Sequence, residues 1–188
     1  MKVICITGRR GAGDAIDTFT SQGTPFNFYA TPAVYDTPVR HGIKLAHVNA
    51  LNIAKKFGIK DSVIVEDDVE LTSKRSLEMF NECRYLATEL GFDILLGGAH
   101  HYATNDEGVI VQVSKLSGMH FYAVLNDKVS FDDCPKNEHI DNWVGKTYKV
   151  GVCNPMIAVQ RVGWSEHHKS DIDYSDMFNR YEILRDNP

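Results

Sequence analysis

The amino-acid sequence predicts an α/β protein with a mainly parallel, Rossmann-type sheet flanked by helices. Short apolar, β-branched segments alternate with longer segments whose apolar residues recur at steps of three and four. This is the pattern of strands that alternate with amphipathic helices. No internal repeat or Pro/Ser-rich linker interrupts the 188 residues. A chain of this length can bury one hydrophobic core, so we expect a single compact domain over residues 1–188.

The first three elements are predicted from an apolar run and from turn residues. Lys2–Thr7 (KVICIT) is apolar and β-branched enough to form a buried strand, and it leads into a Gly-rich turn at 8–13. Asp14 can cap a short helix that runs towards Gln22, where a glycine ends it. Phe26–Ala30 is then a short strand, because prolines bound it on both sides.

Two longer helices and a buried strand follow. Apolar residues recur at helical spacing over Gly42–Phe57, and the next residue is a glycine that ends the helix. Val63–Val65 is a fully apolar strand that stops at three acidic residues. A second long helix is predicted over about 74–90, again ended by a glycine.

The second half of the chain is expected to be richer in strands. Further strands are predicted at Asp93–Leu96, Val109–Val113 and His120–Leu125. The predicted order is therefore β-α-β-α-β-α-β, followed by shorter and less regular β-structure. This order favours a parallel sheet with helices packed against it.

Composition narrows the class of protein. The formal net charge is −5 and no block of Lys and Arg occurs, so bulk electrostatics do not favour binding to nucleic acid. Net charge does not describe a single groove, so local contacts to such a polymer stay open. No apolar run approaches the ~20 residues of a membrane span, and we expect a cytoplasmic protein. The four cysteines show no metal-ligand or disulfide spacing and are interpreted as reduced thiols.

The acidic triplet Glu66-Asp67-Asp68 is the main chemical feature of the sequence. It follows a predicted parallel strand directly, and ligands of α/β sheets bind beyond the carboxyl ends of the strands. Crowded carboxylates repel one another, and a hard cation such as Mg²⁺ or Mn²⁺ relieves that repulsion. Because side chains alternate along a strand, Glu66 and Asp68 can share one face while Asp67 points elsewhere. A solvated acidic turn is an equally weighted interpretation of the triplet alone.

The segment that contains this triplet resembles a known family. Residues 42–71, GIKLAHVNALNIAKKFGIKDSVIVEDDVEL, are similar to the core signature of glycosyltransferase family 25, which includes lipopolysaccharide-type and collagen galactosyltransferases. Gly42, His47 and the acidic triplet match the signature, whereas Ala46 stands where the family usually has serine.

The resemblance continues downstream in the family's order and approximate spacing, over about residues 40–172. The similar positions are Ser117-Gly118 with Tyr122, His139 and Asp141 with Gly145, Pro155, Val159-Gln160, and Ser170-Asp171-Ile172. The N-terminus departs from the pattern. The family has an Asn-Leu turn and an Arg-rich helix where this chain has the segment TGRRGAG at 7–13. The acceptor-side insertions of larger family members are also missing, so neither the donor base nor the acceptor is identified.

The resemblance implies a GT-A-like fold and a metal-dependent, inverting glycosyltransferase. Such an enzyme would move a hexose from a nucleotide sugar, of the UDP-galactose or UDP-glucose type, to a hydroxyl group of a glycan or another acceptor. The donor and metal half would span about 1–98 and the acceptor half about 99–188. Two alternatives stay open. One is a non-catalytic nucleotide- or glycan-binding module of the same fold, and the other is a phage-type transferase that glycosylates modified DNA bases.

The resemblance also implies roles for the acidic residues. Asp68 would ligate the Mn²⁺ or Mg²⁺ ion that bridges the donor diphosphate, with Glu66 as a second ligand or a ribose contact. A late histidine completes the metal shell in many GT-A enzymes, and His168 is the candidate here. For His168 and the adjacent His167, an exposed polar loop is the competing interpretation. Asp141 would be the general base that accepts the proton of the acceptor hydroxyl, or else a loop aspartate that caps the segment beginning at Asn142.

The remaining candidates are substrate contacts. The donor-binding set comprises Thr7, Arg9, Arg10, His47, Glu66 and Asp67, and the acceptor-binding set comprises Ser117, Gly118 and His139. The arginines suit a diphosphate, although a solvated basic turn is equally compatible with them. His47 lies on the apolar face of its helix, where a histidine is more often a hydrogen-bonded core residue than a ligand contact. His100 and His101 follow a predicted strand end and are further candidates.

Overall fold

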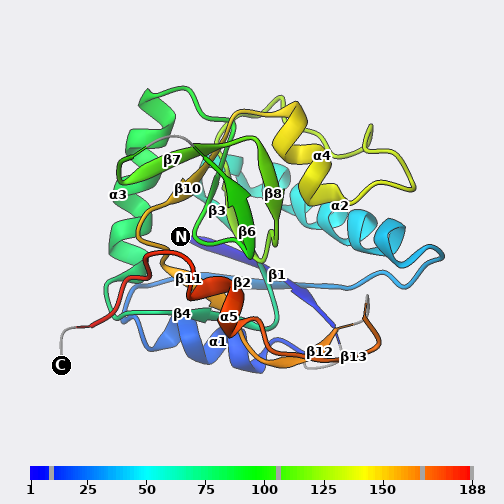
Figure 1. Ribbon diagram of the computed structural model, residues 1–188, viewed down its shortest axis with the longest axis horizontal. Helices are drawn as coiled ribbons and strands as arrows, with labels where there is room; N and C mark the ends of the chain where they lie inside the picture. The colour runs from blue at the N-terminus through cyan, green and yellow to red at the C-terminus, as the bar shows by residue number, and fades with distance from the viewer. Residues whose placement is uncertain (9–10, 105–106, 166–167, 187–188) are drawn as a thin grey trace.

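A seven-stranded mixed sheet forms the centre of the computed structural model, which describes residues 1–8, 11–104, 107–165 and 168–186. In spatial order its strands are β2 (Asn27–Pro32), β1 (Lys2–Thr7), β3 (Ser62–Glu66), β9 (Phe121–Val124), β5 (Ile94–Leu96), β10 (Val150–Cys153) and β7 (Ile110–Val113). Strands β2, β1, β3, β5 and β10 run in one direction, and β9 and β7 run against it. The prediction of an α/β fold with a mainly parallel sheet is therefore confirmed (Figure 1).

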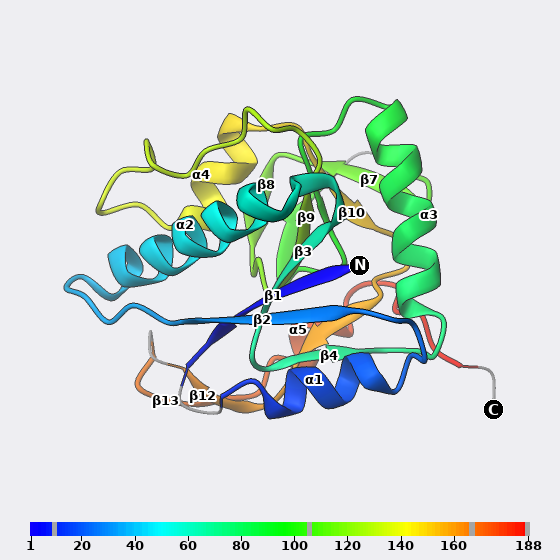
Figure 2. The ribbon, with the colours of Figure 1, turned by 180° about the vertical axis from the view of Figure 1, so that it is seen from behind.

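Helices cover both faces of the sheet. Along β1 the buried side chains alternate between two clusters, with Ile4 in one and Cys5 in the other. Helices α2 (Val39–Phe57) and α4 (Ile140–Thr147) contribute to the first cluster, and α1 (Gly13–Thr20) and α3 (Ser76–Glu89) to the second. Figures 1 and 2 show α2 and α4 lying together, away from α1.

Three two-stranded ribbons and two short helical turns complete the described fold. The ribbons pair β11 (Ala158–Gln160) with β4 (Val69–Leu71), β12 (Gly163–Ser165) with β13 (Ser170–Ile172), and β6 (His101–Ala103) with β8 (Lys115–Ser117). The turns are η1 (Ile59–Asp61) and α5 (Ser175–Phe178). Each ribbon supplies a residue to the site described below, namely Ser117 of β8, Gln160 of β11 and Ser165 of β12.

Two helices begin earlier than the sequence predicts. The first helix starts at Gly13 after Ala12, and no side chain caps it. The prediction that Asp14 is the cap is therefore wrong. Asp14 lies in the first turn, where its negative charge still suits the helix dipole. The second helix starts at Val39, directly after Pro38. Residues 39–41, which the sequence places in the preceding loop, therefore belong to its first turn.

Strand β10 and helix α4 are absent from the predicted elements. The strand is only four residues long and contains Gly151, a residue that weakens a strand prediction. The glycine is required by packing, because a Cβ there would lie 2.7 Å from Cγ2 of Ile110 on the neighbouring strand. In the part of the chain that the structure describes, no helix combines the length and apolar character needed to cross a membrane.

Candidate functional site

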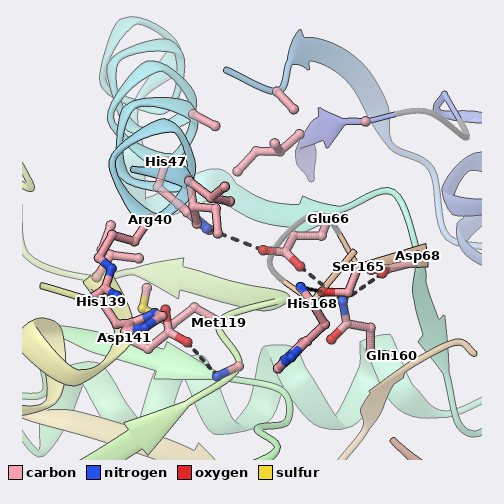
Figure 3. Close-up of a pocket in the computed structure, with 18 of the residues that line it drawn as sticks. Arg40, His47, Glu66, Asp68, Met119, His139, Asp141, Gln160, Ser165 and His168 are labelled. Carbon is pink, nitrogen blue, oxygen red and sulfur yellow. Dashed lines mark hydrogen bonds and ion pairs between the residues drawn. The ribbon is translucent and has the colours of Figure 1, made fainter. Parts of the chain in front are cut away.

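A cavity of about 700 Å³ lies beyond the carboxyl ends of β1 and β3. These strands are parallel and adjacent, with Ile6 opposite Glu66, so the residues that follow them emerge at the same edge of the sheet. Figure 3 shows two groups of side chains around the cavity. One contains Arg40, Met119, His139 and Asp141, and the other contains Glu66, Asp68, Gln160, Ser165 and His168.

The three acids of the triplet separate at this edge. Asp67 accepts a hydrogen bond from the backbone N–H of Gly8, with 2.7 Å between Gly8 N and Asp67 Oδ2. Glu66 and Asp68 instead both accept from the side-chain amide of Gln160. All three acids line the cavity, but Glu66 and Asp68 share a partner and Asp67 has a different one, which agrees with the alternation. The strand ends at Glu66 and a turn follows, so the turn contributes to this separation as well as the strand.

Glu66 contacts the buried side chain of His47, which in turn contacts the buried Tyr122. The His47 ring is 1% exposed. Its Nε2 lies 3.4 Å from Glu66 Oε1, and its Nδ1 lies 2.9 Å from the hydroxyl of Tyr122. Burial would raise the pKa of Glu66, but the hydrogen bond and charge of His47, with smaller contributions from two other histidines, hold it below its ordinary value. Burial raises the pKa of Tyr122 well above its usual range, so its hydroxyl keeps the proton. His47 is thus both a hydrogen-bonded core residue and a cavity-lining contact of Glu66.

Gln160 connects the acidic pair to His100. The β11–β4 ribbon sets Gln160 opposite Val69, next to the acidic turn. The side-chain oxygen of Gln160 contacts Nε2 of His100. The ring of Tyr174 stacks on the ring of His100, with 4.1 Å between the two ring centroids and an interplanar angle of 11°. Burial lowers the pKa of His100, and the nearby Glu66 carboxylate opposes that shift.

Asp141 is positioned by helix α4 and by Gly118. It lies in the first turn of the helix, and its Oδ2 accepts a hydrogen bond from Gly118 N at 2.7 Å. Gly118 has a φ of +89°, and a Cβ there would lie 2.7 Å from Cγ of His100. The alternative in which Asp141 caps a segment beginning at Asn142 is wrong, because the helix begins at Ile140, after His139. Ser117, Gly118 and His139 all line the cavity with Asp141.

The predicted metal ligands are assembled only in part. Among the described residues, no group of three or more His, Cys, Asp or Glu side chains is arranged to hold a metal ion. Glu66 and Asp68 share a partner, whereas His168 lines the cavity from the β12–β13 turn and donates its backbone N–H to the Ser165 hydroxyl. Mg²⁺ is commonly held by one or two carboxylates plus substrate phosphates, and the carboxylate pair fits that manner of binding. The role of His168 stays a prediction.

The other predicted substrate contacts lie outside the cavity wall or outside the described residues. The Thr7 hydroxyl donates to the carbonyl of Thr31, and Thr7 is not part of the cavity wall. Arg9, Arg10 and His167 lie outside the described residues. His101 is exposed on β6, with Nδ1 3.3 Å from the Tyr181 hydroxyl. The N–H of Gly8, in the Gly-rich turn that follows β1, donates to Asp67.

Sequence reasoning missed several residues of the cavity. Arg40 lines it and donates from Nη1 to the carbonyl of Asn137 at 2.8 Å. The predicted start of the helix at residue 42 leaves Arg40 in a loop, although Pro38 is a recognisable signal for an earlier start. Trp164, Tyr174 and Met177 also line the cavity. They follow the strands of the sheet in a late segment whose path the sequence did not reveal.

Comparison with known proteins shows a shared fold. No protein-family model matches the chain, and no curated protein matches it. The crystal structure of A197 from STIV is similar over 100% of this chain and 99% of A197, with a TM-score of 0.60 and 12% sequence identity. At this identity the similarity concerns the arrangement of helices and strands, and the chemistry has to be inferred from the residues of the site.

Proposed function

We propose that the chain is a divalent-cation-dependent glycosyltransferase that moves a hexose from a nucleotide sugar to a hydroxyl acceptor. One observation carries this proposal. A single cavity of about 700 Å³ contains the carboxylate pair Glu66 and Asp68 together with the separate carboxylate Asp141. The size is in the range of small-ligand sites. The resemblance of residues 40–172 to glycosyltransferase family 25 supports the same interpretation.

The carboxylate pair forms the donor end of the proposed site. Asp68 would be a ligand of Mn²⁺ or Mg²⁺, and Glu66 a second ligand or a contact of the ribose. When bound, the cation supplies positive charge to offset the charge that grows on the leaving diphosphate. His47, which is itself hydrogen-bonded to Tyr122, orients the Glu66 carboxylate. Such preorganisation means that little rearrangement is needed when the donor binds.

Asp141 forms the acceptor end of the proposed site. In a single displacement the acceptor oxygen bonds to the anomeric carbon, and the bond from that carbon to the diphosphate oxygen breaks. The acceptor proton passes to the Asp141 carboxylate, which acts as general base. The hydrogen bond from Gly118 N orients this carboxylate. The configuration at the anomeric carbon is inverted as a result.

A second candidate is a binding module that holds a nucleotide or a glycan without turning it over. The observation in its favour is that the amide of Gln160 already contacts both carboxylates of the pair. Together with the lack of a preassembled three-ligand group among the described residues, this arrangement is also compatible with a cavity that binds ligands without a metal.

The two candidates differ in donor turnover. A panel of nucleotide sugars is incubated with Mn²⁺ or Mg²⁺ and with glycan, lipid-linked and modified-DNA acceptors, and the products are identified by mass spectrometry. We expect turnover that depends on the cation and is lost in Asp68→Asn. Asp127→Asn, an exposed residue outside the cavity, is the matched control. Tight donor binding without turnover favours the binding module, and cation-independent turnover unaffected by Asp68→Asn rejects the metal-dependent mechanism.

A further inference from the structure

The amide of Gln160 lies between the two carboxylates of the proposed metal site. Its Nε2 is 2.7 Å from Asp68 Oδ2 and 3.3 Å from Glu66 Oε2. One nitrogen with two hydrogens thus contacts both acids (Figure 3). A divalent cation held by this pair would meet the same two carboxylates and satisfy the same need for positive charge. The amide and such a cation would therefore compete for one position.

The oxygen of the same amide determines the hydrogen-bonding role of His100. The Gln160 oxygen contacts His100 Nε2, and an amide oxygen only accepts hydrogen bonds. His100 therefore donates its Nε2–H to Gln160. The His100 ring lines the cavity and stacks on Tyr174. While the amide holds the carboxylates, this ring nitrogen is occupied.

The amide of Gln160 can leave this arrangement by a rotation of its side chain, without a movement of the main chain. Its backbone is fixed in the β11–β4 ribbon opposite Val69, and the next residue, Arg161, donates its N–H to the Asp68 carbonyl at 2.9 Å. The main chain therefore stays beside the acidic turn. A rotation of the side chain is enough to remove the amide from the carboxylates, and it also separates the amide from His100.

We propose that Gln160 is a positioning residue that occupies the place of the cation until the cation binds. This inference rests on the proposed function, because it needs Glu66 and Asp68 to be the cation ligands. Entry of the cation expels the amide from between the carboxylates and ends its contact with His100. The Nε2–H of His100 is then available to an oxygen of a ligand in the same cavity. Gln160 thus couples occupation of the metal site to the hydrogen-bonding state of the ligand site.

The test measures cation affinity in the absence of nucleotide. Mn²⁺ binding to the full chain is followed by calorimetry for wild type, Gln160→Met and Gln112→Met. Met keeps the length of the side chain and removes the amide. Gln112 is exposed on β7, outside the cavity, and provides the matched control. Loss of a competing charge-assisted hydrogen bond is expected to tighten Mn²⁺ binding by about three- to tenfold in Gln160→Met, with no change in Gln112→Met.

A second readout follows His100 itself. In ¹⁵N-histidine spectra of the wild type, saturating Mg²⁺ should shift the His100 ring signals, which are assigned with a His100→Asn variant. In Gln160→Met the ring signals should already be shifted without Mg²⁺, because the amide is gone. Gln160→Ala must change the affinity in the same direction as Gln160→Met, so the result does not depend on how one replacement side chain packs.

The outcomes separate this inference from the proposed function. Equal Mn²⁺ affinity in wild type and Gln160→Met leaves the metal site in place and overturns the role of Gln160. Weaker binding in Gln160→Met makes Gln160 a ligand and overturns the inference as well. If none of the proteins binds Mn²⁺, with or without a nucleotide sugar, the cation dependence of the proposed function is rejected. The inference about Gln160 is then rejected as well.

Discussion

The His47 ring joins Glu66 to the core, with Nε2 of His47 lying 3.4 Å from Oε1 of Glu66. On its other side the ring meets the hydroxyl of Tyr122, a residue of the central strand β9 that is fully buried. A carboxylate at the cavity is therefore connected to the middle of the sheet through two side chains. The orientation of Glu66 therefore depends on Tyr122, which contacts His47 and does not itself line the cavity.

Removal of the Tyr122 hydroxyl should weaken both the fold and the site. Tyr122→Phe keeps the ring and leaves Nδ1 of His47 buried without its partner, which costs about 1–3 kcal/mol in the free energy of unfolding. Urea denaturation measures this cost, and Tyr85→Phe, 73% exposed on α3, should change it by less than about 0.5 kcal/mol. Similar stability of Tyr122→Phe and wild type would show that the hydroxyl does not support His47.

Asp141→Asn should remove general-base catalysis while keeping the local structure. The Asn side-chain oxygen can still accept from Gly118 N, so the helix remains anchored, but the side chain no longer takes up a proton. We expect kcat for sugar transfer to fall by about 10²- to 10⁴-fold, with donor and Mn²⁺ affinity unchanged. Asp133→Asn, at an exposed position, serves as the control. Transfer at the wild-type rate in Asp141→Asn would assign the base to another residue.

Gly118→Ala should disturb the acceptor end of the cavity. The backbone φ of +89° disfavours a side chain, and the added Cβ would lie 2.7 Å from Cγ of His100. We expect the free energy of unfolding to fall by more than about 1 kcal/mol, measured by thermal and urea denaturation. Gly13→Ala is the matched control, because a Cβ at Gly13 meets nothing within 4 Å. Equal effects of the two substitutions would contradict the steric argument.

The C-terminal segment that contains Leu184 and Asp186 should dock less tightly at low pH. The hydrogen bond from the Ser73 hydroxyl, and to a lesser degree the backbone N–H of Lys74, hold the pKa of Asp186 below its usual value. The stabilisation is therefore present above the unfolded-state pKa and is lost as the pH falls through the lower folded-state pKa. Hydrogen exchange at Leu184 N, which donates to the Met156 carbonyl, reports the docking.

The control for this prediction is Asp186→Asn. At pH values well above the carboxyl pKa, the variant should exchange faster than wild type at Leu184. The difference should shrink and disappear as the pH falls below the folded-state pKa of Asp186, because the wild-type carboxyl is then also uncharged. A difference that persists unchanged in acid would show that charge on Asp186 does not hold the tail.

Elements with a strong local signal were predicted well. The strand Lys2–Thr7 has the predicted bounds, because a run of apolar, β-branched residues ends at glycine. The long helix before Gly58 was also predicted, with an error at its start. The antiparallel direction of β9 was not predictable, since an apolar strand looks the same in either direction and its neighbours are decided by packing.

The sequence by itself determined the class of the fold and placed the acidic triplet at the carboxyl end of a parallel strand, because periodicity and turn residues act locally. Only the tertiary structure decided which groups meet there. Gln160 reaches Glu66 and Asp68 across more than ninety residues of sequence through the β11–β4 ribbon. Asp141 reaches Gly118 through the start of α4. Such contacts depend on how strands pair and helices pack. A local residue pattern describes one segment at a time, so it does not show which distant segments meet.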